Sequence, residues 1–374
     1  MFLARAFVAF SAVALAAPPA GKPVGGLQRL LYVTNKSGIS IYDINDSHKK
    51  LHDIEIPRTG IYKGISASVP LGQLQLTSNL EDDIVSIDLE SEKIVWRKSY
   101  QGKYPDSQAI TPDGKTLYVP LRGTDSWVIL DAASGAEKGT IKVAHGENYA
   151  KDNHPIGGVG PHNTWMNPSG TRVYFAVLTE PWVYVADTAT NKLIGKVGPF
   201  SKGIRPFCVT DDEKYVFANV DWLLGFEVAA GPGAGSKTSG KMLHRIQAAT
   251  PASRLAQIPK PPEHMPHSTF SHGINIRPDQ KEVWVVDGVY GYVYIYDVSK
   301  MPPHQVASVP LFQEPVEQPH PGWITFGLDG TYAYPDGGAV IDTRTKKVVA
   351  RIPTSEKLIE IDFRDGKPVR AGHR

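Results

Sequence analysis

Cysteine is almost absent from this chain of 374 residues, which contains only Cys208. A single thiol excludes an internal disulfide. Because Cys208 lies between Phe207 and Val209 in an apolar run, the sequence predicts a buried, inert side chain and not a nucleophile.

An excess of one charge is also missing. Lys and Arg number 40 and Asp and Glu 38, which gives a formal net charge of +2, and the basic residues are spread along the chain. Nucleic-acid binding proteins usually carry a concentrated basic surface. The composition therefore gives no support to a nucleic-acid partner.

Two common catalytic motifs are lacking. The glycine-rich stretch at 229–241 does not have the order of a phosphate-binding loop, so it is interpreted as a flexible surface hairpin. No nucleophile elbow or Ser-His-Asp order is present, which argues against a serine hydrolase.

The N-terminus is typical of an exported protein. Residues 1–17 combine Arg5 with an apolar run that ends in small residues, the pattern of a signal peptide cleaved near Ala16 or Ala17. No later stretch reaches the roughly 18 apolar residues of a membrane span. We expect a secreted or periplasmic protein with no membrane span and a linker at 18–29.

Six segments repeat in one register, each an apolar strand that ends in a turn. They cover 63–72, 104–114, 160–170, 204–214, 270–280 and 320–330, and their turns end at Gly72, Gly114, Gly170, Glu213, Gln280 and Gly330. A β-rich run, a strand ending in Asp and a fourth short strand follow most of them. Four short strands per unit at a period of roughly 40–50 residues predict the blades of a β-propeller.

The two ends of the chain supply the strands of a seventh blade. Residues 30–44 form a unit without its inner strand, and 357–363 are a strand without a unit. Joining them gives an all-β, seven-bladed propeller of four-stranded antiparallel blades over 30–363, with one blade shared by the termini and no open sheet edge at the seam. A C-terminal tail is expected at 364–374.

Tyr32-Val33-Thr34-Asn35 and the run PDGKTLYVP at 112–120 carry a family likeness. The chain resembles the YVTN-type seven-bladed β-propeller repeat family, whose architecture is similar to the nitrous oxide reductase propeller and to quinoprotein-like propellers. The resemblance covers nearly all of the mature chain. It implies the fold and leaves the function open, because propellers host many activities.

The repeat alignment places polar side chains at one equivalent position, at the start of successive inner strands. These residues are Lys63, Asp106, His162, Arg205, His272 and Gly322, with His320 two residues before the last. They are expected to converge at one end of the channel, which we call the top. We assign catalytic roles to Asp106, Arg205 and Lys63, because the two cations suit an anion and the carboxylate can orient a His or act as a base.

Histidines in the entering loops point to a metal. His162, His272 and His320 are the predicted ligands, and copper is favoured over zinc because imidazole suits both and the compartment suits copper. In the nitrous oxide reductase propeller a copper cluster is similarly placed, although this chain does not reproduce its His pattern. Further pocket residues are expected at His145, Tyr149, His154, His267, Asp287 and Trp323.

The ends of the second strands add charged residues to the same face, which we interpret as a solvated rim: Arg122, Glu180, Asp221, Asp287 and Asp336. Three functions remain open. The first is a metal-dependent oxidoreductase or Lewis-acid enzyme acting on a small polar or anionic substrate. The others are a non-catalytic propeller that binds a protein, peptide or small ligand, and a metal-free lyase or lactone hydrolase.

Overall fold

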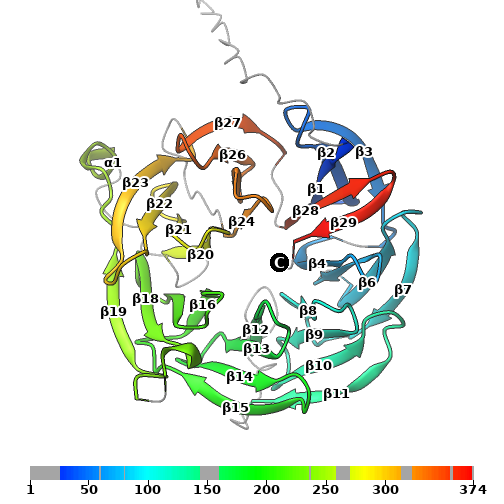
Figure 1. The fold of residues 1–374 in the computed structure, drawn as a ribbon, viewed down its shortest axis with the longest axis horizontal. Helices are drawn as coiled ribbons and strands as arrows, with labels where there is room; N and C mark the ends of the chain where they lie inside the picture. The colour runs from blue at the N-terminus through cyan, green and yellow to red at the C-terminus, as the bar shows by residue number, and fades with distance from the viewer. Residues whose placement is uncertain are drawn as a thin grey trace, which may run out of the picture.

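Seven antiparallel sheets surround a central axis in the computed structural model (Figure 1). The structure describes residues 26–58, 60–79, 81–143, 160–235, 237–257, 270–312, 322–353 and 357–372. The chain is a seven-bladed β-propeller, as the repeat pattern predicted.

Six blades have four strands each, which follow one another in the chain from the axis outward. The first two are β4 (Tyr62–Ser68), β5 (Gln73–Ser78), β6 (Asp83–Asp88) and β7 (Ile94–Ser99), then β8 (Ala109–Ile110), β9 (Thr116–Leu121), β10 (Ser126–Asp131) and β11 (Glu137–Lys142). The next two are β12 (Pro161–Met166), β13 (Arg172–Val177), β14 (Val183–Asp187) and β15 (Lys192–Val197), then β16 (Ile204–Val209), β17 (Tyr215–Val220), β18 (Gly225–Ala230) and β19 (Met242–Gln247). The last two are β20 (Ser271–Ile276), β21 (Glu282–Asp287), β22 (Tyr292–Asp297) and β23 (His304–Pro310), then β24 (Ile324–Phe326), β25 (Tyr332–Pro335), β26 (Ala339–Asp342) and β27 (Lys347–Arg351).

The seventh blade joins the two ends of the described chain. Its strands run in the order β29 (Lys367–Ala371), β28 (Leu358–Arg364), β1 (Gln28–Asn35), β2 (Gly38–Asp43) and β3 (Lys49–Glu55). β28 pairs antiparallel with β1, opposing Leu30 and Ile361. The expected sharing of one blade by both termini is therefore confirmed.

This closing blade has a fifth strand where the repeat pattern predicted only a tail. Residues 367–371 form β29, which pairs with β28 and lies near the axis (Figure 1). Asp365 and Gly366 connect the two strands with φ angles of 51° and 77°. Two consecutive left-handed residues are the signature of a tight hairpin, so this Asp-Gly pair extends the sheet beyond residue 363.

Apolar side chains fill the spaces between and within the blades. Trp127 and Trp284 are fully buried, and the indole Nε1 of Trp127 donates a 2.8 Å hydrogen bond to the hydroxyl of Thr164 in the next blade. Large aromatics with a satisfied polar atom suit such interfaces. Cys208 is fully buried in β16, as predicted.

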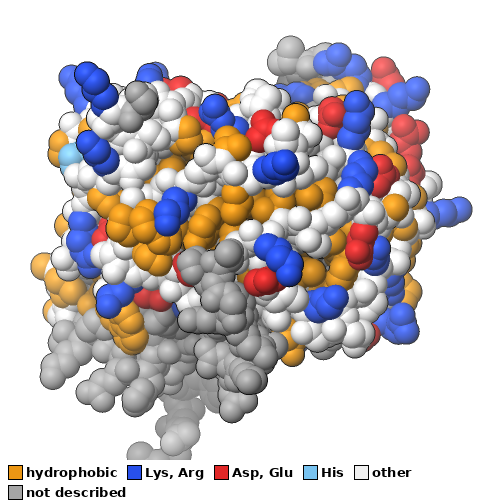
Figure 2. Space-filling model, turned by 90° about the horizontal axis from the view of Figure 1, so that it is seen from below, with side chains coloured by type: hydrophobic (Ala, Val, Ile, Leu, Met, Phe, Trp, Pro, Cys, Tyr) orange, Lys and Arg blue, Asp and Glu red, His pale blue; other side chains and the backbone are white. Residues whose placement is uncertain are grey.

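The outer strands form the rim of the disc and expose some apolar side chains. Leu193 and Ile194 of β15 are exposed, and Figure 2 shows an apolar band on this part of the rim, with Lys and Arg side chains on either side. Helix contributes little. The described residues include a short α-helix, α1 (Ala252–Gln257), and a 3-10 turn, η2 (Pro232–Ala234), and none of the helices among them is long and apolar enough to cross a membrane.

Candidate functional site

In four blades the repeated polar position coincides with a break in the β-ladder. Register shifts fall between Tyr62 and Gly64 in β4, Pro161 and Asn163 in β12, Ile204 and Phe207 in β16, and Ser271 and Ile274 in β20. These bulges contain Lys63, His162, Arg205 and His272. A bulge leaves a residue outside the ladder and redirects its side chain, and bulges are frequent beside functional sites.

Asp106 lies just before β8, where regular pairing has not begun. Its backbone N–H donates to the carbonyl of Pro120, and the neighbouring Ser107 bridges to Asn163 of β12. These two contacts place the Asp106 carboxylate between Arg122, which follows β9, and His162 of the next blade. The site therefore forms across a blade interface.

Asp106 and Arg122 make a buried ion pair. Arg122 Nη1 lies 3.4 Å from Asp106 Oδ2, and both side chains are only 1% exposed. The prediction of a solvated rim is wrong for Arg122, Glu180 and Asp287, which are buried, and the Arg122 side chain turns inward toward the Asp106 carboxylate. A pair buried to this extent is strongly destabilised when either partner is removed.

His162 contacts the other oxygen of the same carboxylate. Its Nε2 lies 3.7 Å from Asp106 Oδ1, while its Nδ1 donates a hydrogen bond to the side-chain oxygen of Asn163. A neutral imidazole with its proton on Nδ1 carries a lone pair on Nε2. Asp106 is thus placed to stabilise a proton taken up at Nε2.

His272 lies next to His162, with ring centroids 6.4 Å apart. Its Nδ1 donates a 2.8 Å hydrogen bond to the carbonyl of Gly322, whose own N–H donates to Asp336 Oδ2 at 3.1 Å. This chain of contacts fixes the tautomer of His272 and leaves its Nε2 as an acceptor. The structure thus brings together four of the aligned positions, Asp106, His162, His272 and Gly322.

Two further cations complete the cluster. Arg205 Nε lies 2.9 Å from Asp221 Oδ1. Lys357 Nζ lies 3.8 Å from the ring centroid of Trp323, a distance typical of a cation–π contact. Arg205 and Lys357 both act electrostatically on His162, which places them in the same neighbourhood.

Burial, followed by the positive charges of Arg122, Arg205 and Lys357, holds the pKa of His162 well below its usual value of 6.5, although the Asn163 contact opposes the shift. Burial and the nearby Arg205 also lower the pKa of Arg122, whereas Asp106 raises it. His162 is consequently neutral at pH 7 in a positive environment.

The other predicted site residues lie outside this cluster or outside the described residues. Asp287 is buried, and its carboxylate accepts hydrogen bonds from the backbone of Val289 and Tyr290 and from the Tyr294 hydroxyl, so it organises its own turn. Burial raises its pKa to about 6. Lys63 is half-buried, and its carbonyl accepts a hydrogen bond from the Ser107 hydroxyl. The remaining predicted positions lie outside the described residues: His145, Tyr149, His154, His267 and His320.

Sequence reasoning missed the roles of Arg122 and Lys357. Arg122 follows the second strand of its blade, and Lys357 precedes the strand that closes the ring. Neither belongs to the aligned position. Two features of the sequence could have indicated the role of Arg122. It directly follows the apolar run TLYVPL, and Asp106 belongs to the same repeat unit.

The described residues contain no group of three or more His, Cys, Asp or Glu side chains arranged to hold a metal ion. His162 and His272 supply two imidazoles, each with Nδ1 engaged by an oxygen. That second-sphere arrangement is the usual one for metal-binding histidines. The nearby cations disfavour a bare metal ion at the same place.

Solved structures share this architecture at low sequence identity. Hydrazine synthase from Kuenenia stuttgartiensis is 16% identical over 84% of this chain and 96% of that chain, with a TM-score of 0.59. Dihydro-heme d1 dehydrogenase NirN in complex with DHE is 14% identical over 96% of this chain and 74% of that chain, with a TM-score of 0.58. The β-propeller domain of Cps50 (Swd1) from Myceliophteria thermophila is 11% identical over 85% of this chain and 91% of that chain, with a TM-score of 0.58.

No family model and no curated protein sequence matches the chain. At identities of 11–16% the similarity concerns the fold alone. The chain is thus similar to propellers named as enzymes and to one named only as a propeller domain. What these comparisons establish is a seven-bladed β-propeller.

Proposed function

We propose that the top of the channel binds a small anion, such as a carboxylate or phosphate compound, and that His162 accepts a proton from it in a metal-free acid–base reaction. The observation that carries this proposal is the neutral, buried His162 beside Arg122, Arg205 and Lys357. Of the three alternatives from the sequence, the metal-free enzyme fits this charge distribution best.

The charges favour an anion over a cation. Asp106 pairs with Arg122 and Asp221 with Arg205, while Lys357 lies on the ring of Trp323. An anion entering this cluster would interact with three cations in an environment partly shielded from water, where charge-assisted hydrogen bonds are strong. Arg is the better of the two basic residues for holding an oxyanion pair.

Proton transfer follows from the position of His162. Its Nε2 carries a lone pair, and the Asp106 carboxylate 3.7 Å away would stabilise the imidazolium once a proton arrives. A bound anion would raise the pKa of His162 toward neutrality by offsetting the three cations. Substrate binding would thereby convert a weak base into an effective one.

Isothermal titration with sulfate tests the binding step, because sulfate stays a dianion from pH 5 to 8. We expect saturable binding that weakens at least tenfold in Arg205→Gln, since one charge-assisted contact contributes about 1.5–3 kcal/mol. Arg172→Gln is the matched control, because Arg172 makes a similar ion pair with Glu213 elsewhere in the fold. Equal sulfate affinity in the wild type and Arg205→Gln would contradict the proposal.

A copper or zinc enzyme is the second candidate, supported by the matching tautomers of His162 and His272. These two Nε2 atoms would hold the metal, and copper would supply redox chemistry or, like zinc, Lewis-acid activation of the substrate. Elemental analysis of untagged protein distinguishes the candidates. Near-stoichiometric metal that is lost in a His162→Ala, His272→Ala double variant would favour this second function over the first.

We also infer export to the periplasm or beyond the cell, and membership of the YVTN-type repeat family. The first rests on the signal-peptide pattern of residues 1–17 and the second on the Tyr32–Asn35 motif together with the seven blades. N-terminal sequencing of the protein produced with its full leader tests export, and the expected new N-terminus lies just after Ala16 or Ala17.

A further inference from the structure

A separate cavity opens at the opposite end of the channel. It has a volume of about 340 Å³, and its walls include Trp165, Met166, Asn275, Ile276, Thr325 and Phe326. These residues come from the later parts of β12, β20 and β24, whereas His162 and His272 lie near the starts of β12 and β20. Trp165 and Asn275 follow His162 and His272 by three residues each, about 10 Å along a strand, so the cavity lies further along the channel than the anion site.

Equivalent positions of several blades line this cavity, as they do the anion site. Ala109, Trp165, Asn275 and Thr325 all line it, and they precede their turn residues Gly114, Gly170, Gln280 and Gly330 by the same number of positions. Four blades thus contribute one equivalent residue each. One is a large aromatic and two are small and polar, which makes the cavity asymmetric.

Thr325 provides an unused hydrogen-bonding group. The residue is only 4% exposed, and its hydroxyl has no hydrogen-bond partner among the residues that the structure describes. Burying a hydroxyl without a partner is unfavourable, so such an atom in a cavity wall is a ready contact for a ligand. The adjacent Asn275 is already engaged: its Nδ2 donates to the Ile324 carbonyl and its Oδ1 accepts from the Ile276 N–H.

Trp165 provides a flat apolar wall. It is half-buried and packs against the two hydrophobic clusters that flank the next blade, β16–β19, which restrains the ring. Among the lining residues that the structure describes, Asp211 alone has a formal charge, in contrast to the three cations at the top. The size, the aromatic wall and the low charge are typical of a site for a small uncharged molecule.

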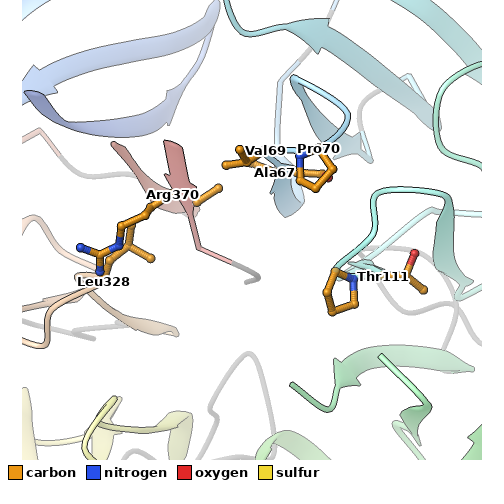
Figure 3. A pocket seen from close by; sticks show the side chains of 9 residues that line it. Ala67, Val69, Pro70, Thr111, Leu328 and Arg370 are labelled. Carbon is orange, nitrogen blue, oxygen red and sulfur yellow. The ribbon is translucent and has the colours of Figure 1, made fainter. Parts of the chain in front are cut away.

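We propose that this cavity binds a neutral, aromatic small molecule that stacks on Trp165 and accepts a hydrogen bond from the Thr325 hydroxyl. An adjoining hollow of about 330 Å³ shares the lining residues Pro112 and Leu328 and contains Arg370 (Figure 3). Arg370 lies 3.4 Å from the buried Asp362 carboxylate. Because an anionic ring compound would be drawn toward Arg370, charge discriminates between the two hollows.

Titration of 4-fluorobenzamide, followed by ¹⁹F NMR, tests the proposal. We expect saturable binding that weakens at least tenfold in Trp165→Leu and about threefold to tenfold in Thr325→Val, as expected for the loss of one neutral hydrogen bond. With the anion site saturated by sulfate, the charged analogue 4-fluorobenzoate should compete with the benzamide for this cavity at least tenfold more weakly than unlabelled benzamide does. Saturating sulfate and Arg205→Gln should leave the affinity for the benzamide unchanged, which separates this site from the anion site.

Trp222→Leu is the matched control, because Trp222 is 58% exposed in the β17–β18 turn, at the opposite end from this cavity. Thr325→Val keeps the side-chain shape and removes a hydroxyl without a described partner, so it remains informative if Trp165→Leu does not fold. Three results would overturn the proposal: no saturation in the wild type, unchanged affinity in Thr325→Val, or competition by the benzoate that equals competition by unlabelled benzamide in saturating sulfate.

Discussion

At the scale of single residues, the side chains of the site contact residues that are distant from them in the sequence. The alignment predicted that His162, Arg205 and His272 would converge, and the structure places His162 beside His272 and within the electrostatic reach of Arg205. Arg122 could not be predicted in the same way. Its burial depends on the carboxylate of Asp106, which lies just before β8 in the same blade, and the sequence does not show that the two side chains pair.

The low pKa of His162 predicts that anion binding is coupled to proton uptake. An anion favours the protonated imidazole, so sulfate affinity should increase as the pH falls from 8 toward 6. Calorimetry in buffers with different ionisation enthalpies should show proton uptake on binding. In His162→Gln both the proton uptake and the pH dependence should disappear while sulfate still binds.

A wild type that binds sulfate with no proton exchange between pH 6 and 8 would show that His162 does not take part. Without a ligand, a lower pH has the opposite effect: it makes the protonation of His162 unfavourable for folding. Because the folded pKa lies below the unfolded value, His162 contributes stability above pH 6.5, and that contribution is lost as the pH falls below 6.5 toward its folded pKa.

At the scale of the elements, the blades could be predicted because their turns repeat. The Asp residues that close the third strands have a structural role, because Asp88, Asp131 and Asp187 accept hydrogen bonds from the Ser or Thr three residues later. β29 was not predicted, because it has no counterpart in the other blades. Its only local signal is the Asp365-Gly366 pair.

A substitution at Gly366 tests how much the β28–β29 turn contributes to stability. Its φ is 77°, and a Cβ at this position would meet nothing within 4 Å, so Gly366→Ala changes only the backbone preference. We expect a loss of about 1 kcal/mol in the free energy of unfolding, measured by denaturant titration.

Gly195→Ala in β15 is the control for this change. A Cβ there also meets nothing within 4 Å, and the backbone is not left-handed, so the variant should be neutral or slightly more stable. Equal effects of the two substitutions would mean that the Asp365-Gly366 turn does not limit the stability of the hairpin.

At the scale of the whole molecule, the ring is closed by pairing β28 with β1, and the seam contains buried carboxylates. Arg29 Nε lies 2.7 Å from Glu360 Oε1, and Asp362 is fully buried two residues further along β28. Burial, and then the nearby Glu360 charge, raise the pKa of Asp362 to about 7. The repeats predicted the closure, but they gave no indication of these charges, because the seam occurs once.

Ring stability should therefore depend on pH. A carboxyl whose folded pKa exceeds its unfolded value of about 3.9 favours folding most at low pH, and the benefit is lost as the pH rises toward 7. Between pH 6.5 and 8, above the range in which His162 affects stability, the melting temperature of the wild type should fall, and Asp362→Asn should reduce that fall. Asp297→Asn, at an exposed turn, should retain the wild-type dependence.

A pH profile of Asp362→Asn that is superimposable on that of the wild type would exclude this carboxyl as the cause. Such a result would turn attention to Glu360, which shares the seam.

At the bulges near the starts of the inner strands, the residues that pair in the β-ladder differ from the residue that faces the site. Residues in the ladder hold each blade, while the residue inside the bulge is outside that pairing. Exchanging this one residue in a blade should thus alter what the channel recognises with little effect on the sheet. A library that varies Lys63, Arg205 and His272 together could therefore be selected for new ligands.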